Sequence, residues 1–205
     1  MFPNILILDN LINMKIVFII VVLFFSSSVV AEDISNFEIE GMSIGDSALN
    51  FFNENEIKKN SKNYYKNNQF TPVQNDGYPF FNTYDAIDFQ FKTGDSKYII
   101  HSLSGILIYT NNIDECYPKM NQIVYELKNI FKNADFDDIQ TTGHPNDPEG
   151  NKGTSKITDA FFYLESGIIS VACYDYSKVH NNQDHLSVSI DTYEFNDWLF
   201  NKAYK

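Results

Sequence analysis

Apolar residues between Ile113 and Phe131 recur at steps of three and four, which is the spacing of one helical face. Polar residues fill the positions between them and form the opposite, solvated face. Asn112 or Asp114 can cap the first turn, and Pro118 falls near that turn, where a proline costs no backbone hydrogen bond. The pattern therefore predicts the main helix of the chain over residues 113–131.

Other segments alternate apolar and polar residues or are short apolar runs, and both patterns are typical of strands. In the first of these segments, Ile87, Phe89 and Phe91 alternate with polar residues. The links between several of them are short, which favours antiparallel pairing of neighbours. We expect strands over residues 84–92, 97–109, 156–164, 168–176 and 185–192.

Shorter helices are predicted near both ends of this region. Asn53 and Glu56 have the spacing of a capping box, which places a short helix directly after Asn53. The turn before them can start another helical piece over residues 48–52. Residues 195–203 form the last helix, with Trp198 facing inward.

Two segments show neither the helical spacing of three and four residues nor the alternation that is typical of strands. Residues 61–83 mix aromatic residues with amides and prolines, and we expect them to wrap the core irregularly. Residues 133–155 are rich in Asp, Asn, Gly, Pro and Thr, which predicts a mobile loop. The chain is therefore expected to fold as an α+β domain with an antiparallel sheet of about five strands, in the order ββαβββα, packed on one main helix, with short N-terminal helices.

The N-terminus has the pattern of an export signal. Met14 and Lys15 precede the ten apolar residues 16–25, and the small residues that follow end in Ala31. We expect residues 1–31 to be a signal peptide with its true start at Met14, cleaved after Ala31. The apolar run is shorter than the roughly 20 residues of a membrane span, and an uncleaved signal anchor is the alternative.

The mature chain is expected to be one domain. Residues 32–83 form an N-terminal helical clasp and irregular wrap, and residues 84–205 form the α+β core. No cysteine stands at the cleavage site, so a lipid anchor is not expected there. The predicted location is the periplasm or the extracellular medium.

The two cysteines of the chain, Cys116 and Cys173, both lie in the mature part. An even number of cysteines in an oxidising compartment favours a disulfide, here between the main helix and a strand. In the chain-entropy model such a bridge contributes about 4 kcal/mol. The alternative is a thiol nucleophile activated by a helix N-terminus, although the C-x-x-C spacing of redox enzymes is missing.

The composition is acidic, with a formal net charge of −12 and no arginine. Nucleic acids and anionic membrane surfaces need clustered positive charge, so neither is an expected partner. We expect no stable membrane insertion after signal cleavage and no cofactor. The sequence does not identify a partner, and an envelope protein and a small ligand are the two candidates.

The catalytic candidates are Asp175, His180, Asp184 and His185, which bracket one hairpin loop. Two histidines with carboxylates form a set that holds zinc or acts as a general base. Their spacing matches no zinc pattern, so we expect a solvated hairpin tip and no metal, with a catalytic set as the alternative. Residues 147–153 alternate oxygen-bearing side chains but lack the Gly and Glu that an EF-hand loop requires.

Aromatic residues of the irregular segment are the candidates for ligand binding. Tyr64, Tyr65, Tyr78 and Phe80 lie among amide side chains, a combination found in sugar and peptide sites. We expect burial of these rings in the core, and ligand binding is the alternative. The motifs of the common serine hydrolases, nucleotide enzymes and zinc proteases are absent from the sequence.

The run Phe37-Glu-Ile-Glu-Gly-Met-Ser-Ile-Gly-Asp-Ser47 resembles the start of an uncharacterised family of small exported proteins from planktonic marine bacteria. The stretches around Cys116, at 173–177 and at 184–186 are also similar to that family. The family has no assigned activity, so the resemblance implies export and a single domain only. The sequence thus predicts an exported, small acidic protein that is a non-enzymatic binding or envelope-associated protein, or alternatively a hydrolase using the Asp/His cluster of the 175–185 loop.

Overall fold

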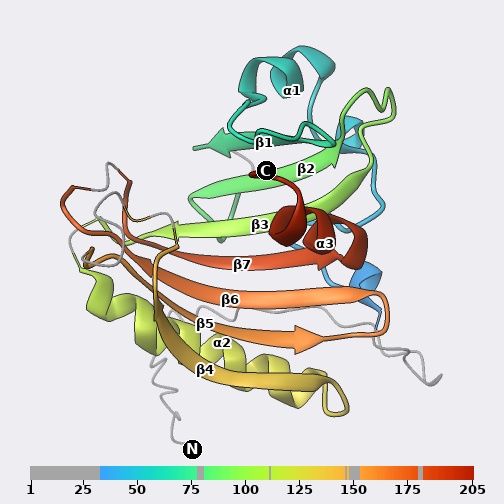
Figure 1. The fold of residues 1–205 in the computed structure, drawn as a ribbon. Coiled ribbons are helices and arrows are strands. Elements are labelled where there is room, and N and C mark those ends of the chain that lie inside the picture. The colour runs from blue at the N-terminus through green and yellow to red at the C-terminus, as the bar shows by residue number, and fades with distance from the viewer. Residues whose placement is uncertain (1–32, 78–80, 111, 146, 148–152, 180–181) are drawn as a thin grey trace, which may run out of the picture. The chain divides into compact units, whose positions relative to one another are not determined.

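The computed structural model describes residues 33–77, 81–110, 112–145, 147, 153–179 and 182–205 (Figure 1). The chain from Ala31 to Lys205 forms one compact unit. The predicted signal peptide lies outside the described residues. Within the part that is described, no helix has the length and apolarity needed to cross a membrane.

Seven strands form a single antiparallel sheet in the order β1-β2-β3-β7-β6-β5-β4. Two three-stranded meanders, β1-β2-β3 and β4-β5-β6, are joined because β7 pairs with β3 on one side and β6 on the other. The strands are β1 (Phe70–Asp76), β2 (Ala86–Lys92), β3 (Ile100–Ile108), β4 (Asp135–Gly143), β5 (Lys156–Tyr163), β6 (Gly167–Asp175) and β7 (His185–Thr192).

The predicted fold class is therefore wrong. The described residues form a mostly-sheet structure with seven strands and three α-helices, not an α+β domain of about five strands on one main helix. The missing strands are β1, which lies in the segment expected to be irregular, and β4, which lies in the expected mobile loop. Both are edge strands, and Pro72 in β1 fits an edge because a proline cannot donate to a sheet ladder.

Helix α2 (Cys116–Ile130) covers one face of the sheet, where it packs against β6 and β7 (Figure 1). A 3-10 turn, Ile113–Glu115, leads into it. Met120, Val124 and Leu127 of α2 are buried in the main core, together with the apolar residues of β2, β3, β5, β6 and β7 that face it. The predicted disulfide is confirmed, because Cys116 of α2 is bonded to Cys173 of β6 with their Cα atoms 6.1 Å apart.

Helix α1 (Glu54–Asn60) packs against β1 and begins with the predicted capping box. Asn53 Oδ1 accepts a hydrogen bond from the backbone N–H of Glu56, and the Glu56 carboxylate accepts one from the N–H of Asn53. Each bond satisfies an N–H group that the first helical turn leaves without a partner. A 3-10 turn, Ala48–Asn50, stands where the other short N-terminal helix was expected.

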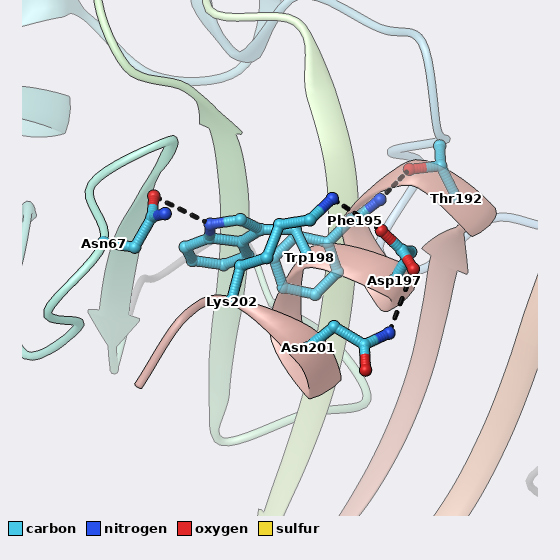
Figure 2. Close-up of polar contacts among 7 residues, drawn as sticks. All are labelled: Asn67, Thr192, Phe195, Asp197, Trp198, Asn201 and Lys202. Carbon is cyan, nitrogen blue, oxygen red and sulfur yellow. Dashed lines mark hydrogen bonds and ion pairs between the residues drawn. The ribbon is translucent and has the colours of Figure 1, made fainter. Parts of the chain in front are cut away.

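Helix α3 (Tyr193–Asn201) follows β7 directly and lies on the opposite face of the sheet from α2 (Figure 1). Its buried residues Phe195 and Trp198 pack with Phe70 of β1 in a second, smaller core. The side chain of Thr192 caps the helix, since its hydroxyl accepts a hydrogen bond from the N–H of Phe195 at 3.1 Å (Figure 2). This helix covers part of the second face and leaves the remainder half-buried.

Candidate functional site

The second face of the sheet is built from every other residue of the central strands. It carries many polar residues beside a few apolar ones such as Ile106, Ile168 and Ala172. Gln90 of β2 is in register with Ser102 of β3, and Ser102 with Asp191 of β7. In the next row, Asp88 is in register with Ser104. Because side chains alternate across a strand, these residues share one face while their apolar neighbours enter the core under α2. The residues that we call the polar face are Asp88, Gln90, Ser102, Ser104, Asp159, Ser170, Ser187, Ser189 and Asp191.

Hydrogen bonds connect the serines of the polar face. The hydroxyl of Ser189 lies 2.8 Å from that of Ser104 and 3.0 Å from that of Ser187. Gln74 of β1 donates a hydrogen bond from Nε2 to Asp88 Oδ2 at 3.2 Å. The middle of the sheet thus carries an ordered set of hydroxyl and carboxyl groups rather than the apolar surface that a covering helix would need.

Two carboxyl groups of the polar face are half-buried and therefore only partly hydrated. Burial raises the pKa of Asp191 to about 6, against the lowering effect of a hydrogen bond from Ser102. Burial also raises the pKa of Asp88 to about 6, although the hydrogen bond from Gln74 and the charge of Lys62 lower it. Neither carboxylate takes part in the ion pairs found among the described residues. Burying a charge without a partner is unfavourable, and such groups concentrate at functional sites.

Two further acceptors of the polar face have no hydrogen-bond partner in the part of the chain that is described. One is Oε1 of Gln90, whose residue is only 7% exposed, and the other is Oδ1 of Asp159. Burial also raises the pKa of Asp159. Most buried polar atoms in proteins are paired, so each of these atoms marks a point where a donor is missing. Gln90 lies on β2 and Asp159 on β5, so the two points lie in opposite halves of the sheet.

Tyrosine rings stand beside the polar face. Tyr65 contacts Tyr64, Trp198 and Tyr204 edge-on, with ring centroids 4.6, 4.8 and 5.4 Å away. Tyr64 and Tyr204 are 47% and 49% exposed. The negative charge of Asp88 helps to raise the pKa of Tyr64 to about 12, after burial, which is the main cause. We call Tyr64, Tyr65 and Tyr204 the tyrosine cluster.

Helix α3 holds the tyrosine cluster in place. The buried indole of Trp198 donates a hydrogen bond from Nε1 to Oδ1 of Asn67 at 3.1 Å (Figure 2). The backbone N–H of Asn67 in turn donates to the carbonyl of Ala203 at 3.0 Å. The segment that carries Tyr64 and Tyr65 is thereby tied to the C-terminal segment that carries Tyr204.

A surface hollow of about 250 Å³ opens next to the tyrosine cluster. Tyr65, Phe70 and Pro72 are among its lining residues. Pro72 is in register with Gln90, so the hollow lies at the β1 side of the polar face. Of the predicted binding residues, Tyr65 therefore lines this hollow and Tyr64 contacts Tyr65, whereas Tyr78 and Phe80 lie outside the described residues.

The far end of the polar face is aromatic as well. The rings of Tyr174 and His185 stack with centroids 4.6 Å apart, and the two residues are in register across β6 and β7. Tyr176 lies near His185 at 5.9 Å and near His144 at 5.3 Å. Burial lowers the pKa of His185, and its Nδ1 lies 2.9 Å from the carbonyl of Gln183.

The described members of the predicted catalytic cluster are divided between the two faces. His185 joins Tyr174, whereas Asp175 points to the side of α2, where its charge acts on Tyr117. Asp184 Oδ1 accepts a hydrogen bond from the N–H of Tyr176 at 2.8 Å. The charge of Asp184 acts on Asp175 and also on His185, whose ring lies on the other face of the sheet with Tyr174. His180 lies outside the described residues.

The segment 147–153, which has the alternating oxygen-bearing side chains of a calcium loop, is described only in part. Asp147 is buried, and its carboxylate accepts a hydrogen bond from the N–H of Ser155 at 2.9 Å. Residues 148–152 lie outside the described residues. Across the part of the chain that the structure describes, no group of three or more His, Cys, Asp or Glu residues is placed to hold a metal ion.

The polar face was not foreseen from the sequence, although one signal for it was present. Serines occupy alternate positions at 102 and 104 in β3 and at 187 and 189 in β7. Comparison with protein-family models, curated proteins and solved structures finds no match for this chain. The function must therefore be argued from the site itself.

Proposed function

We propose that this protein is an exported, non-enzymatic binding protein whose ligand lies on the polar face of the sheet. The observation that carries the proposal is the set of acceptors at the centre of the sheet, which are half-buried at Asp88 and Asp191 and buried at Gln90. Asp88 and Asp191 are held there without an ion pair, and Gln90 without a hydrogen bond to Oε1, among the described residues. A ligand that donates hydrogen bonds offsets the cost of burying these groups.

The position of the aromatic residues supports the same site. The tyrosine cluster flanks one end of the polar face, and the stack of Tyr174 on His185 flanks the other. Ligand sites commonly combine aromatic surfaces with a few convergent polar groups. The hollow beside Tyr65 gives a small molecule room to reach the β1 side of the face.

Export is the second part of the proposal. It is supported by the predicted signal peptide and by the disulfide between Cys116 and Cys173, since disulfides persist in oxidising compartments. Cell fractionation followed by mass measurement tests it. We expect a periplasmic or secreted chain that begins after Ala31 and has no free thiol, and a cytoplasmic chain with two thiols would contradict it.

Ligand binding is tested by measuring the unfolding midpoint against a panel of amines, amino acids and neutral oligosaccharides. A bound ligand raises the midpoint because it stabilises only the native state. Ser104→Arg places a long charged side chain on the polar face and should abolish the shift. Ser96→Arg, at an exposed serine outside that face, is the matched control and should keep it.

Three results would contradict this proposal. One is a panel in which no compound raises the midpoint. Another is a shift that survives Ser104→Arg, which would place the ligand elsewhere. The third is turnover of a panel compound, which would show that the protein is an enzyme and would support the hydrolase alternative at the 175–185 loop.

A further inference from the structure

We infer that the ligand of the polar face is a linear aliphatic polyamine in its protonated form, bound through its N–H groups to the acceptors of β2, β3 and β7. This inference rests on the proposed function, because it names the ligand class for the same site. Four properties of the face lead to it: an excess of acceptors, an uncompensated negative charge, exposed tyrosine rings, and the spacing of its carboxylates.

The first property is the excess of acceptors over donors. Gln90 Oε1 has no donor among the described residues, and a carboxylate offers about four acceptor positions. Asp191 has a side-chain hydrogen bond from Ser102, and Asp88 has one from Gln74. An ammonium group has three donors and no acceptor, so it supplies what these atoms lack. A sugar hydroxyl brings acceptor lone pairs along with its single donor.

The second property is charge. The chain has a formal net charge of −12, and Asp88 and Asp191 are half-buried without ion pairs within the described residues. Lys62 is the cation whose charge acts on Asp88, and it is exposed. An anionic ligand would be repelled by the face, and a neutral one would leave its carboxylates uncompensated. A cation forms charge-assisted hydrogen bonds with them.

The third property is the tyrosine cluster. The exposed rings of Tyr64 and Tyr204 offer π-faces to a ligand at the edge of the polar face. A cation close to such a ring is attracted by its quadrupole. The ring edges are also apolar, so they can contact the methylene groups between two nitrogens of an aliphatic chain.

The fourth property is spacing. Asp88 on β2 and Asp191 on β7 are separated by the single strand β3 and differ by one row of the register. Strand spacing and rise place their Cα atoms about 12 Å apart. A single ammonium group cannot contact both carboxylates, whereas a chain with a nitrogen near each end can. The geometry therefore favours a polyamine over a simple amine.

Titration calorimetry with spermidine, putrescine, methylamine and maltotriose tests the inference on the full mature chain. We expect spermidine to bind most tightly and maltotriose not to bind. Asp88→Asn and Asp191→Asn should each weaken spermidine at least tenfold. Asp197→Asn is the matched control, because Asp197 is an exposed carboxylate of α3 paired with Lys202 instead, and it should change nothing.

Lys62→Gln should change the affinity for spermidine in the opposite direction, because removing the cation near Asp88 should tighten binding. Trp198 fluorescence of each variant checks that it is folded. Spermidine binding that survives both polar-face Asp→Asn variants and disappears at 0.15 M salt, roughly the physiological ionic strength, would be general attraction to an acidic protein and would overturn the inference.

The same experiment separates this inference from the proposed function. Failure of spermidine to bind, together with a neutral compound whose effect is lost in Ser104→Arg, overturns the polyamine alone. Absence of any compound sensitive to Ser104→Arg overturns the binding site itself.

Discussion

Replacing Asp191 by Asn should stabilise the protein at neutral pH. The carboxyl group is half-buried between Ser102 on β3 and Ile168 on β6, and the described residues provide no cation to pair with it. Asn has nearly the same shape and keeps an oxygen that accepts the hydrogen bond from Ser102. The substitution therefore removes the buried charge while leaving the packing almost unchanged.

The size of the effect follows from the pKa of Asp191, which burial raises from 3.8 to about 6. A shift of about two pKa units corresponds to about 3 kcal/mol, which is an upper limit. Part of the side chain remains exposed and solvent screens its charge, so we expect a gain of about 1 to 2 kcal/mol at pH 7. Tyr65 and Tyr174, whose pKa values the charge of Asp191 helps to raise, are neutral at this pH and do not compensate it.

The gain should depend on pH with a defined sign. The native pKa lies above the unfolded value, so the native state holds the proton at higher pH and loses stability as pH rises from 3.8 to about 6. Below this window the native carboxyl is protonated and resembles Asn, so the variant and the wild type should have similar stability. Above the window the full difference should be present and constant.

Urea unfolding followed by the fluorescence of Trp198, the single tryptophan, measures this difference. Denaturation midpoints of the wild type and Asp191→Asn are compared at pH 4 and pH 7. Asp197→Asn is the control, because its ion pair with Lys202 lowers the pKa of Asp197, and its loss should destabilise the protein slightly at pH 7. A destabilised Asp191→Asn at pH 7, or an equal difference at both pH values, would refute the reasoning.

Three other substitutions give expected outcomes that chemical denaturation can check. Replacing both Cys116 and Cys173 by Ser should cost about 4 kcal/mol, since the bridge closes a loop across 57 residues, and an unchanged midpoint would contradict the structural role of the bond. Asn67→Ala leaves the buried indole N–H without an acceptor and should lower the free energy of unfolding by about 1 to 3 kcal/mol. Asn201→Ala, at an exposed site, should lower it less. Equal losses would argue against a stabilising role for the hydrogen bond between Trp198 and Asn67. His185→Ala should cost about 1 kcal/mol through loss of its ring stack, and a loss of catalytic turnover would instead support the hydrolase alternative.

The elements with a strong hydrophobic period could be predicted from the sequence. β7 has the predicted bounds, and the main helix differs only in its first turn, which is 3-10, and at its last residue. Cys116 and Cys173 could be paired because the chain has no others. For β7 and the main helix, the residues that the structure buries in the core are apolar residues of the sequence pattern.

The edge strands could not be found in the same way. β4 pairs only with β5 and is exposed along nearly its whole length, so no apolar period marks it. β1 is interrupted by Pro72 and ends in the polar residues Gln74, Asn75 and Asp76. A strand that is held by backbone hydrogen bonds at the margin of a sheet leaves little trace in the hydrophobic pattern.

The polar face could be predicted only in fragments. The alternate serines of β3 and β7 are visible in the sequence, and Tyr64 and Tyr65 were recognised as candidate ligand contacts. The pairing of β3 with β7 joins segments about 85 positions apart, as the contact between Ser104 and Ser189 shows, and no local signal specifies it. Asp88 and Asp191 gain their raised pKa values only from that arrangement.

The insertion of β7 between the two meanders also determines when the molecule can be completed. Each meander pairs strands that are consecutive in the chain, but the joining strand β7 follows the six other described strands in the sequence. Until it is in place, β3 and β6 each present an unpaired margin and three of the central polar residues are missing. The sheet therefore cannot be completed before β7 is available, and the polar face that we propose as a ligand site forms only at that point.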